Sequence, residues 1–468
     1  MPASNHPQRL EDRRLLSTVQ TFAFDELPAI GTTAAGQEVP MGGFSGLVFE
    51  GVSKETGNLR FITHTDRGPN AGEMGLLRPM LLPDFTPQII RFELDPRDGD
   101  LAFTERIPLA TQTGRPLTGL SNLSIPGGTA NTPYNDEAPA DLFGNVLPHD
   151  PLGGDFEGMA VDPRDGSYWL VDEYRPSIYH FHKNGRLKDR FVPVGTAAAA
   201  GMPEGTFGTE VLPAVLAQRR INRGFEAVVV RDCKLYAFMQ SPLRNPATLS
   251  NGNLNAMRNV RVVELDPGTG ATRQFIYVLD NPVPVSAADS RADKVGDAAT
   301  LADGSFLLIE RDDDAIDSDP LETIHKKVYR FALDGATDVS GFPDLIGGKS
   351  MDQMTVEELA AAGIAPIAKT LHVDLAAAGY NAVEKVEGLA VLDDDTIAVI
   401  NDNDFTVGDV TLDTATGTFV RNSEPEPIVL GLVRTEGEAG GSGAMTAFAP
   451  RKRDDRGRFV GASSLLFG

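Results

Sequence analysis

The hydrophobic pattern of this chain repeats five times. In each copy a short apolar run leads into a turn and then into a second apolar run, and a polar residue interrupts the first run at the same point. These polar residues are Ser45, Glu157, Glu226, Asp297 and Glu387. Such self-similarity is typical of a repeat architecture, in which each unit buries its apolar faces against its neighbours.

Each copy also contains alternating apolar segments that predict further strands. In the first copy the strands are expected over 46–51, 59–65, 88–94 and 101–109, and the turn at 95–100 contains the Pro and Asp-Gly signals of a hairpin. The second copy repeats this over 159–162, 167–172, 177–182 and 186–194, and the third over 227–230, 235–240, 260–266 and 272–279. The fourth and fifth copies begin as clearly and are completed by 328–333, 367–374 and 427–434.

Four-stranded units in series are typical of β-propeller blades. The predicted fold class is therefore all-β: a β-propeller with five visible four-stranded repeats, five to seven blades in total, and short helical or loop insertions. The segment 19–27 is expected to supply the missing outer strand of the last blade and so to close the ring. A chain of separate α/β domains is disfavoured, because helical periodicity is confined to short inserts such as 210–221 and 355–362.

The repeat makes residues 17–435 a single propeller domain, preceded by a tail at 1–16. A tail at 436–468 follows, rich in Gly and Ser and then basic. An insertion at about 110–155 is rich in Gly, Pro, Asn and Thr. Because long ordered loops without a function are uncommon, this insertion is interpreted either as a lid or as a surface excursion.

Composition narrows the possible partners. The 468 residues include 42 Lys and Arg against 66 Asp and Glu, a net charge of −24, which argues against nucleic acid or an acidic membrane surface as the partner. The single cysteine, Cys233, excludes an internal disulfide framework. No apolar segment of signal-peptide type occurs in residues 1–20 and no apolar stretch is long enough to cross a bilayer, so no signal peptide and no membrane insertion are expected in the chain as given.

The recurring acids are the first candidates for chemistry. The first strand of each propeller blade lines the central channel, so Glu157, Glu226, Asp297 and Glu387 are expected to converge there. Converging like charges are costly unless they are neutralised. Ca²⁺ accepts six to eight oxygen ligands and would neutralise them, whereas pairing with basic residues or capping of backbone groups is the structural alternative.

Basic residues recur beside the same positions. Candidates for substrate binding are Arg67, Arg175, Arg223, Lys294, Arg311 and Lys385. The predicted metal ligands are Glu157, Asp172, Glu173, Glu226, Asp297, Glu310, Glu387 and Asp402, and the catalytic candidates are His64, Asp66 and Glu157. For His64, a buried structural histidine is the alternative to a general base. Acidic and basic residues around one mouth of the central channel could together bind an anion bridged by a metal ion. Phosphate is such an anion, because it binds both Ca²⁺ and arginine.

Several phrases resemble a known family. They are Gly-Asp-Phe-Glu-Gly-Met-Ala at 154–160, Val-Asp-Glu-Tyr-Arg-Pro at 171–176, Arg-Gly-Phe-Glu-Ala at 223–227, Gln-Ser-Pro-Leu at 240–243, Thr-Asp-Arg-Gly-Pro-Asn at 65–70 and Lys-Val-Glu-Gly at 385–388. Over about 41–435 the chain resembles the bacterial phytase-like domain family, known for "esterase-like activity of phytase". The resemblance implies a propeller-like fold, a periplasmic or extracellular location, hydrolysis of esters or phosphoesters, and Ca²⁺ dependence.

Three functions follow as hypotheses. The first is a Ca²⁺-dependent phosphoester hydrolase, a phytase-like phosphatase or phosphodiesterase, whose small-molecule substrate binds at the channel mouth. The second is a Ca²⁺-dependent propeller carboxylesterase or lactonase. The third is a non-catalytic extracellular binding propeller. The sequence leaves the substrate, the number of metal ions and the oligomeric state open.

Overall fold

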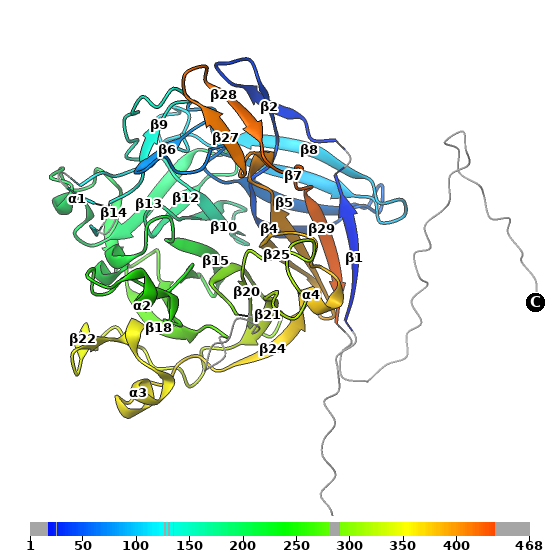
Figure 1. Ribbon diagram of the computed structural model, residues 1–468. Coiled ribbons are helices and arrows are strands. Elements are labelled where there is room, and N and C mark those ends of the chain that lie inside the picture. The colour runs from blue at the N-terminus through cyan, green and yellow to red at the C-terminus, as the bar shows by residue number, and fades with distance from the viewer. Residues whose placement is uncertain are drawn as a thin grey trace, which may run out of the picture.

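Five β-sheets surround a common centre in the structure, a computed structural model that describes residues 17–24, 26–125, 128–129, 132–133, 135–280 and 291–435 (Figure 1). The predicted tails at 1–16 and 436–468 lie outside the described residues. Each sheet is one blade, and the prediction of an all-β propeller with five repeats is confirmed. Within the described part of the chain there is no sixth ring sheet.

The blades follow one another in chain order. The first contains β4 (Phe44–Val52), β5 (Leu59–Thr65), β7 (Gln88–Leu94) and β8 (Leu101–Pro108). The second contains β10 (Phe156–Val161), β11 (Tyr168–Asp172), β12 (Ser177–Phe181), β13 (Leu187–Pro193) and β14 (Thr209–Leu212). The third contains β15 (Phe225–Arg231), β16 (Lys234–Met239), β17 (Asn259–Leu265) and β18 (Thr272–Val278). The fourth contains β19 (Lys294–Thr300), β20 (Phe306–Arg311), β21 (Lys326–Phe331) and β24 (Lys369–Asp374).

The fifth blade closes the ring with both ends of the described chain. Its strands are β25 (Lys385–Asp393), β26 (Thr396–Asp402), β29 (Val429–Arg434) and the N-terminal β1 (Thr18–Ala23). β1 pairs antiparallel with β29, from Thr18 opposite Arg434 to Ala23 opposite Val429, and the two strands lie side by side in Figure 1. The predicted closure by the N-terminal segment is confirmed.

The core lies between blades, because each sheet buries both faces. Tyr236 of the third blade packs edge to face on Phe306 of the fourth, with ring centroids 5.0 Å apart, and one buried cluster joins apolar side chains of the second, third and fourth blades. The first strands β4, β10, β15, β19 and β25 contact one another in sequence around the axis. This arrangement explains why the second strands read as nearly continuous apolar runs, as in β11, where every residue is buried.

Small two-stranded sheets and short helices lie outside the five ring sheets. The two-stranded pairs are β2 (Ala29–Thr32) with β3 (Glu38–Pro40), β6 (Leu77–Pro79) with β9 (Ala138–Ala140), β22 (Leu345–Ile346) with β23 (Lys349–Ser350), and β27 (Val410–Asp413) with β28 (Thr418–Arg421). The helices are α1 (Thr196–Ala199), α2 (Asn251–Asn255), α3 (Val356–Ala361) and α4 (Leu375–Ala378), with 3₁₀ turns η1 (Ala214–Gln218), η2 (Met351–Gln353) and η3 (Asp404–Thr406). Among the described residues, no helix is long and apolar enough to cross a membrane.

One of the two predicted helical inserts is wrong. The segment 355–362 forms α3, as expected, but 210–221 begins as strand β14 and continues as the 3₁₀ turn η1. The open edge of β13 supplies backbone partners to β14, which pairs with it in parallel, and Pro213 then ends the strand. Tertiary pairing outweighs the helical periodicity of this short segment.

The insertion at 110–155 packs against the second blade. Asn122 is fully buried and donates to the Asp172 carboxylate at 2.8 Å, and the Tyr174 hydroxyl donates to the Gly119 carbonyl at 2.8 Å. Strand β9 of the insertion pairs in parallel with β6, which lies in the loop between β5 and β7 of the first blade. The insertion is therefore built into one end of the ring, while an opening and closing motion stays a prediction.

Candidate functional site

A polar pocket of about 260 Å³ lies at the end of the ring where the first strands begin and the second strands end. Antiparallel pairing brings these two kinds of strand end together, which is why acids from both positions meet. Predicted residues that line the pocket are Asp66, Arg67, Glu157, Glu173, Arg223, Lys294, Arg311, Lys385, Glu387 and Asp402. Every blade contributes at least one charged or amide side chain to this wall, the third through Arg223 and Gln240.

A β-bulge in every first strand turns the repeated polar residue toward the axis. The pairing register shifts between Ser45 and Val48, Phe156 and Met159, Phe225 and Ala227, Val295 and Ala298, and Val386 and Gly388. A bulge re-aims a side chain that regular pleating would place elsewhere. The glycine after the acid serves close packing: a Cβ on Gly158 would lie 2.5 Å from the Ala227 Cα of the next blade.

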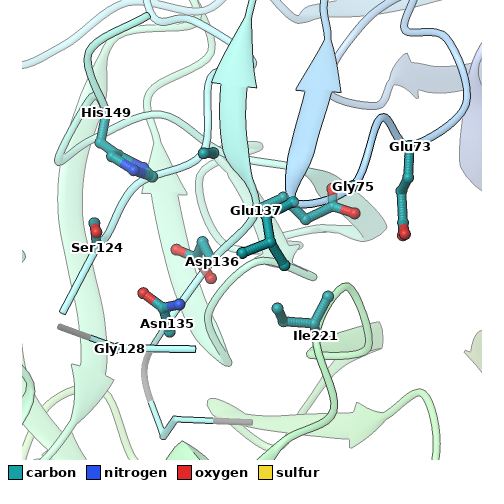
Figure 2. A pocket seen from close by; sticks show the side chains of 11 residues that line it. Glu73, Gly75, Ser124, Gly128, Asn135, Asp136, Glu137, His149 and Ile221 are labelled. Carbon is teal, nitrogen blue, oxygen red and sulfur yellow. The ribbon is translucent and has the colours of Figure 1, made fainter. Parts of the chain in front are cut away.

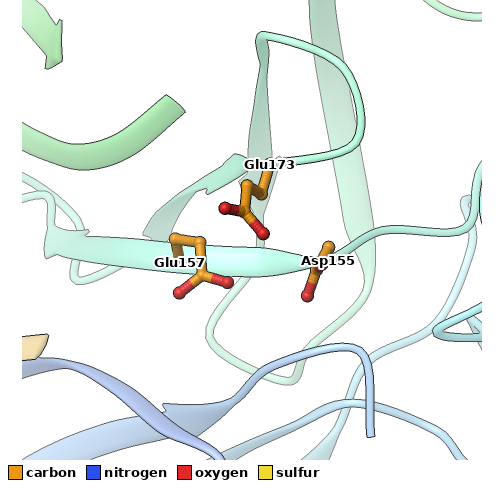
Figure 3. A group of neighbouring side chains, drawn as sticks. All are labelled: Asp155, Glu157 and Glu173. Atoms are coloured by element: carbon orange, nitrogen blue, oxygen red, sulfur yellow. The ribbon is translucent and has the colours of Figure 1, made fainter. Parts of the chain in front are cut away.

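Two groups of three carboxylates share Glu157. Asp155, Glu157 and Glu173 form one group, shown in Figure 3, and Glu157, Glu226 and Glu387 form the other. Within each group one oxygen from every residue lies within 4.8 Å of the others. All five side chains are buried. Carboxylate oxygens at this spacing are suited to a hard divalent cation such as Ca²⁺.

Burial and mutual repulsion dominate the electrostatics of these acids. Burial, followed by the charges of Glu226 and Glu387, raises the pKa of Glu157 well above its ordinary value. Burial and then Asp155 raise the pKa of Glu173 in the same way. Burial raises the pKa of Asp155 to about 6, and burial with Glu387 raises that of Glu226 to about 7. Such groups favour a proton or a cation, because either one removes the uncompensated charge.

Lysine and arginine side chains form ion pairs with the other acidic residues around the pocket. Lys385 Nζ lies 2.5 Å and 2.6 Å from the two Asp404 oxygens and 3.4 Å from the Asp402 carboxylate. Arg311 contacts Glu387 and lies 2.5 Å from Asp313 and 3.6 Å from Glu226.

Arg67 and Arg223 bring two further cations to the same mouth. Arg67 reaches Asp155 at 3.0 Å and Glu137 at 3.3 Å. Arg223 pairs with Asp293 at 2.8 Å, while its Nη1 is buried with no hydrogen-bond partner among the described residues. The wall therefore presents paired cations around a more acidic centre.

Four predicted acids lie outside the pocket wall: Glu226, which still belongs to a carboxylate group with Glu157, and three that stabilise the ring instead. Asp297 accepts hydrogen bonds from the backbone N–H groups of Leu47 at 3.1 Å and Leu389 at 3.0 Å, so it ties β19 to both β4 and β25 across the axis. The other two are held as follows: Asp172 accepts from Asn122, Ser177 and Arg190, and Glu310 from Tyr277, Lys369 and the Asp280 N–H. With their oxygens satisfied in this way, these three are not included among the candidate metal ligands.

His64 and Arg175 also lie outside the pocket. The His64 side chain is fully buried, its Nδ1 lies 3.1 Å from the Thr65 carbonyl oxygen, and burial lowers its pKa to about 4, so the ring is neutral. Arg175 is buried beneath the insertion, 3.7 Å from Asp136 and over the Phe207 ring. Neither side chain reaches the channel mouth.

Sequence reasoning missed several residues that line the mouth. Asp155 precedes Glu157 by two residues and lines the same pocket, so its place in the phrase Gly-Asp-Phe-Glu-Gly was an available signal. Asp404 also had a signal, because it belongs to the run Asn-Asp-Asn-Asp at 401–404, which ends a second strand and was open to interpretation either as Ca²⁺ ligands or as a solvated turn. Asn222 had none, because it enters the pocket from a turn with left-handed backbone, at φ 52°. Arg78 and Glu73 come from the loop around β6, which only the packing of the insertion brings to the mouth.

Comparison with known proteins identifies the family. A family model described as "Phytase-like: Esterase-like activity of phytase" matches residues 39–405. The chain belongs to the phytase-like family. This confirms the resemblance expected from the motifs.

Individual relatives are distant. A protein of Arthroderma benhamiae named "Uncharacterized secreted protein" is 27% identical over 248 residues, covering 46% of each chain, so this chain matches about half the length of that relative. Among solved structures, PhoX of Pseudomonas fluorescens, in complex with the transition-state analogue vanadate, is 11% identical with a TM-score of 0.41, covering 90% of this chain and 96% of that one. An aldose sugar dehydrogenase of Streptomyces coelicolor in its PQQ-bound form is 12% identical with a TM-score of 0.30, covering 89% and 98%.

Proposed function

We propose that this phytase-like protein is a Ca²⁺-dependent phosphoester hydrolase whose site is the pocket at the channel mouth. The observation that carries the proposal is the pair of carboxylate groups sharing Glu157, set in one pocket with basic side chains from several blades. The family description points to ester hydrolysis, and the excess of acid over base points to a bound cation. The substrate is a small molecule, in keeping with the size of the pocket.

The donor set fits calcium. Eight acidic and six basic side chains line the pocket, and Glu226 adds a further carboxylate just behind the wall. Oε1 of Glu226 is buried and accepts no hydrogen bond from the described residues, so it has an open ligand position. The ligands would be Asp155, Glu157, Glu173, Glu226 and Glu387. When bound, Ca²⁺ supplies positive charge that stabilises the negative charge developing on a transferring phosphoryl group.

The basic residues bind and orient the phosphoryl group. Arg223 Nη1 has no hydrogen-bond partner in the part of the chain that the structure describes, and Lys294, Arg311 and Lys385 approach the same space from the fourth and fifth blades. Arginine and lysine at fixed positions provide charge-assisted hydrogen bonds to phosphate oxygens without reorganising during the reaction.

Asp66 is the carboxylate proposed to accept a proton from the attacking water. It lines the pocket and belongs to neither carboxylate group; Oδ1 accepts the Gly68 N–H at 2.8 Å, and Oδ2 is the oxygen proposed to take the proton. Burial and then the charge of Asp155 raise its pKa well above the ordinary value. A base with a raised pKa accepts a proton more readily near neutral pH.

The test compares Glu157→Gln with Glu105→Gln, a control on an exposed edge strand. Hydrolysis of p-nitrophenyl phosphate, bis-p-nitrophenyl phosphate and p-nitrophenyl acetate is measured after EDTA and after Ca²⁺ is restored. Wild type and the control are expected to lose phosphate release in EDTA and to regain it with Ca²⁺. Glu157→Gln is expected to lose at least about 10²-fold in kcat/KM, as for removal of other groups that act on the transition state.

Other outcomes select the alternatives. Turnover of the acetate alone would favour the Ca²⁺-dependent carboxylesterase or lactonase. No turnover of any ester, with Ca²⁺ raising thermal stability alone, would favour a binding propeller. We further propose that the protein is exported, since the matched Arthroderma benhamiae relative is named as secreted; fractionation of cells that express the full-length gene tests this.

A further inference from the structure

A second pocket, of about 190 Å³, lies beside the channel mouth (Figure 2). Glu73 and Ile221 belong to the walls of both pockets, so the two spaces adjoin. In Figure 2 these two residues lie on the side opposite His149 and Ser124. A molecule held in the central pocket therefore has a route past Ile221 into the second one.

The charges in the wall of this side pocket are already neutralised. Glu137 receives Arg78 at 2.6 Å and Arg67 at 3.3 Å, and Asp136 pairs with Arg219 and accepts the Leu123 N–H at 2.9 Å. Among the described residues that line it, none is a lysine or an arginine. The side pocket consequently has nothing to compensate an anion, in contrast to the central pocket.

What remains for a ligand is apolar surface with a polar edge. Leu76, 68% exposed, and the half-buried Ile221 supply the apolar part. His149 uses Nδ1 toward the Ser121 hydroxyl at 3.0 Å, and no hydrogen bond joins its Nε2 to another of the described residues, so Nε2 is available to a ligand within that part of the chain. The exposed Ser124 adds a hydroxyl. Burial lowers the pKa of His149, so its ring is neutral at neutral pH. Apolar walls with a few polar groups are typical of small-molecule subsites.

We infer that the side pocket binds the organic alcohol part of the substrate and selects phosphoesters of uncharged aryl or alkyl alcohols. The inference rests on the proposed function, because the phosphoryl group must occupy the central pocket. It also predicts discrimination against polyols with a second phosphate at this position, since buried Asp136 and Glu137 would face that phosphate with no free cation. The insertion at 110–155 is thereby a specificity element, because it supplies most of this wall.

The test fills the side pocket from two walls. Ala138→Phe and Ser124→Trp each line the side pocket and not the central one, and Val420→Phe on the exposed face of β28 is the control. Phosphate release is measured from 1-naphthyl phosphate and from methyl phosphate, whose methyl group is too small to need the side pocket. The filled variants are expected to lose about tenfold or more in kcat/KM for the naphthyl ester, and to change less than about twofold for the methyl ester.

An equal loss on both esters, or no loss on either in both folded variants, would overturn the inference. Binding of 1-naphthol by calorimetry in Ca²⁺ buffer separates it from the proposed function. If wild type releases phosphate from neither ester, the proposed function fails. In that case naphthol binding that is lost in the filled variants still supports the pocket, whereas equal binding in wild type and variants rejects it. Ser124→Trp, on an exposed loop, keeps the test available if Ala138→Phe does not fold.

Discussion

Replacing Glu226 by glutamine measures how much folding free energy is lost by placing several buried carboxylates together at the channel mouth. Glu226 accepts a hydrogen bond from Gln240 at 2.7 Å, lies 3.6 Å from Arg311, and belongs to the carboxylate group of Glu157 and Glu387. Burial, and then the Glu387 charge, raise its pKa from 4.5 to about 7. The carboxylate and the amide are nearly isosteric, so Glu226→Gln removes the charge with little change in packing.

The sign of the effect follows from proton linkage. Between pH 4.5 and about 7 the folded protein binds more protons at Glu226 than the unfolded chain does, so the free energy of unfolding falls as pH rises through this window. The full shift corresponds to a loss on the order of 3 kcal/mol at pH 8 without a cation. Weakening the Gln240 hydrogen bond costs about 1 kcal/mol, so Glu226→Gln is expected to stabilise the cation-free protein by about 2 kcal/mol at pH 8.

Guanidinium unfolding at pH 5 and pH 8, in EDTA and in Ca²⁺, measures this directly. Wild type is expected to gain more from Ca²⁺ at pH 8 than Glu226→Gln does, because the variant has lost a ligand. Glu264→Gln is the matched control: Glu264 is equally buried, but hydrogen bonds from Arg273 and Lys234 outweigh burial and lower its pKa.

The control should lose stability at pH 8 and keep the full Ca²⁺ response. The same pH dependence and the same Ca²⁺ response in wild type and Glu226→Gln would refute the reasoning.

Two further substitutions test the contact between the second and third blades and the binding of phosphate by the basic residues of the pocket. Gly158→Ala would place a Cβ 2.5 Å from the Ala227 Cα and 2.7 Å from the Glu226 carbonyl, so overpacking should cost at least about 2 kcal/mol in chemical unfolding; Gly72→Ala, with open space around it, is the control, and equal stabilities would contradict the contact. Lys385→Gln removes a cation from the pocket wall. Calorimetry in Ca²⁺ buffer should show that inorganic phosphate binds about tenfold more weakly, a change of ~1.4 kcal/mol in binding free energy. Unchanged affinity would show that Lys385 does not bind the phosphate.

Much of the fold was accessible from the sequence because its signals are local and repeated. The strands at 59–65 and 88–94 match the predicted ranges residue for residue, since turn residues delimit them: Thr-Gly-Asn before 59, and Pro before 88 and after 94. Ring closure by the N-terminal strand followed from a blade that lacked an outer strand. The helix expected over 210–221 was wrong, because the open edge of a neighbouring strand decided that segment.

The site was less accessible, because side-chain direction depends on pairing between distant segments. The repeated acids at 157, 226 and 387 converge as expected, whereas Asp297 at the same repeat position turns to backbone N–H groups of two other blades. Asn222 reaches the mouth from a turn that carries no motif, whereas Asp404 belongs to the acidic run at 401–404.

The sequence by itself determined the five-fold repeat, the propeller class and the gathering of acids and bases at one end of the ring. It did so because the same hydrophobic periodicity and the same kinds of turn residue recur in every repeat. The tertiary structure decided which oxygens are left without hydrogen-bond donors, and therefore which acids form the two groups around Glu157. It also decided that the insertion builds a second pocket against the first, since that wall forms only when segments far apart in the chain pack together.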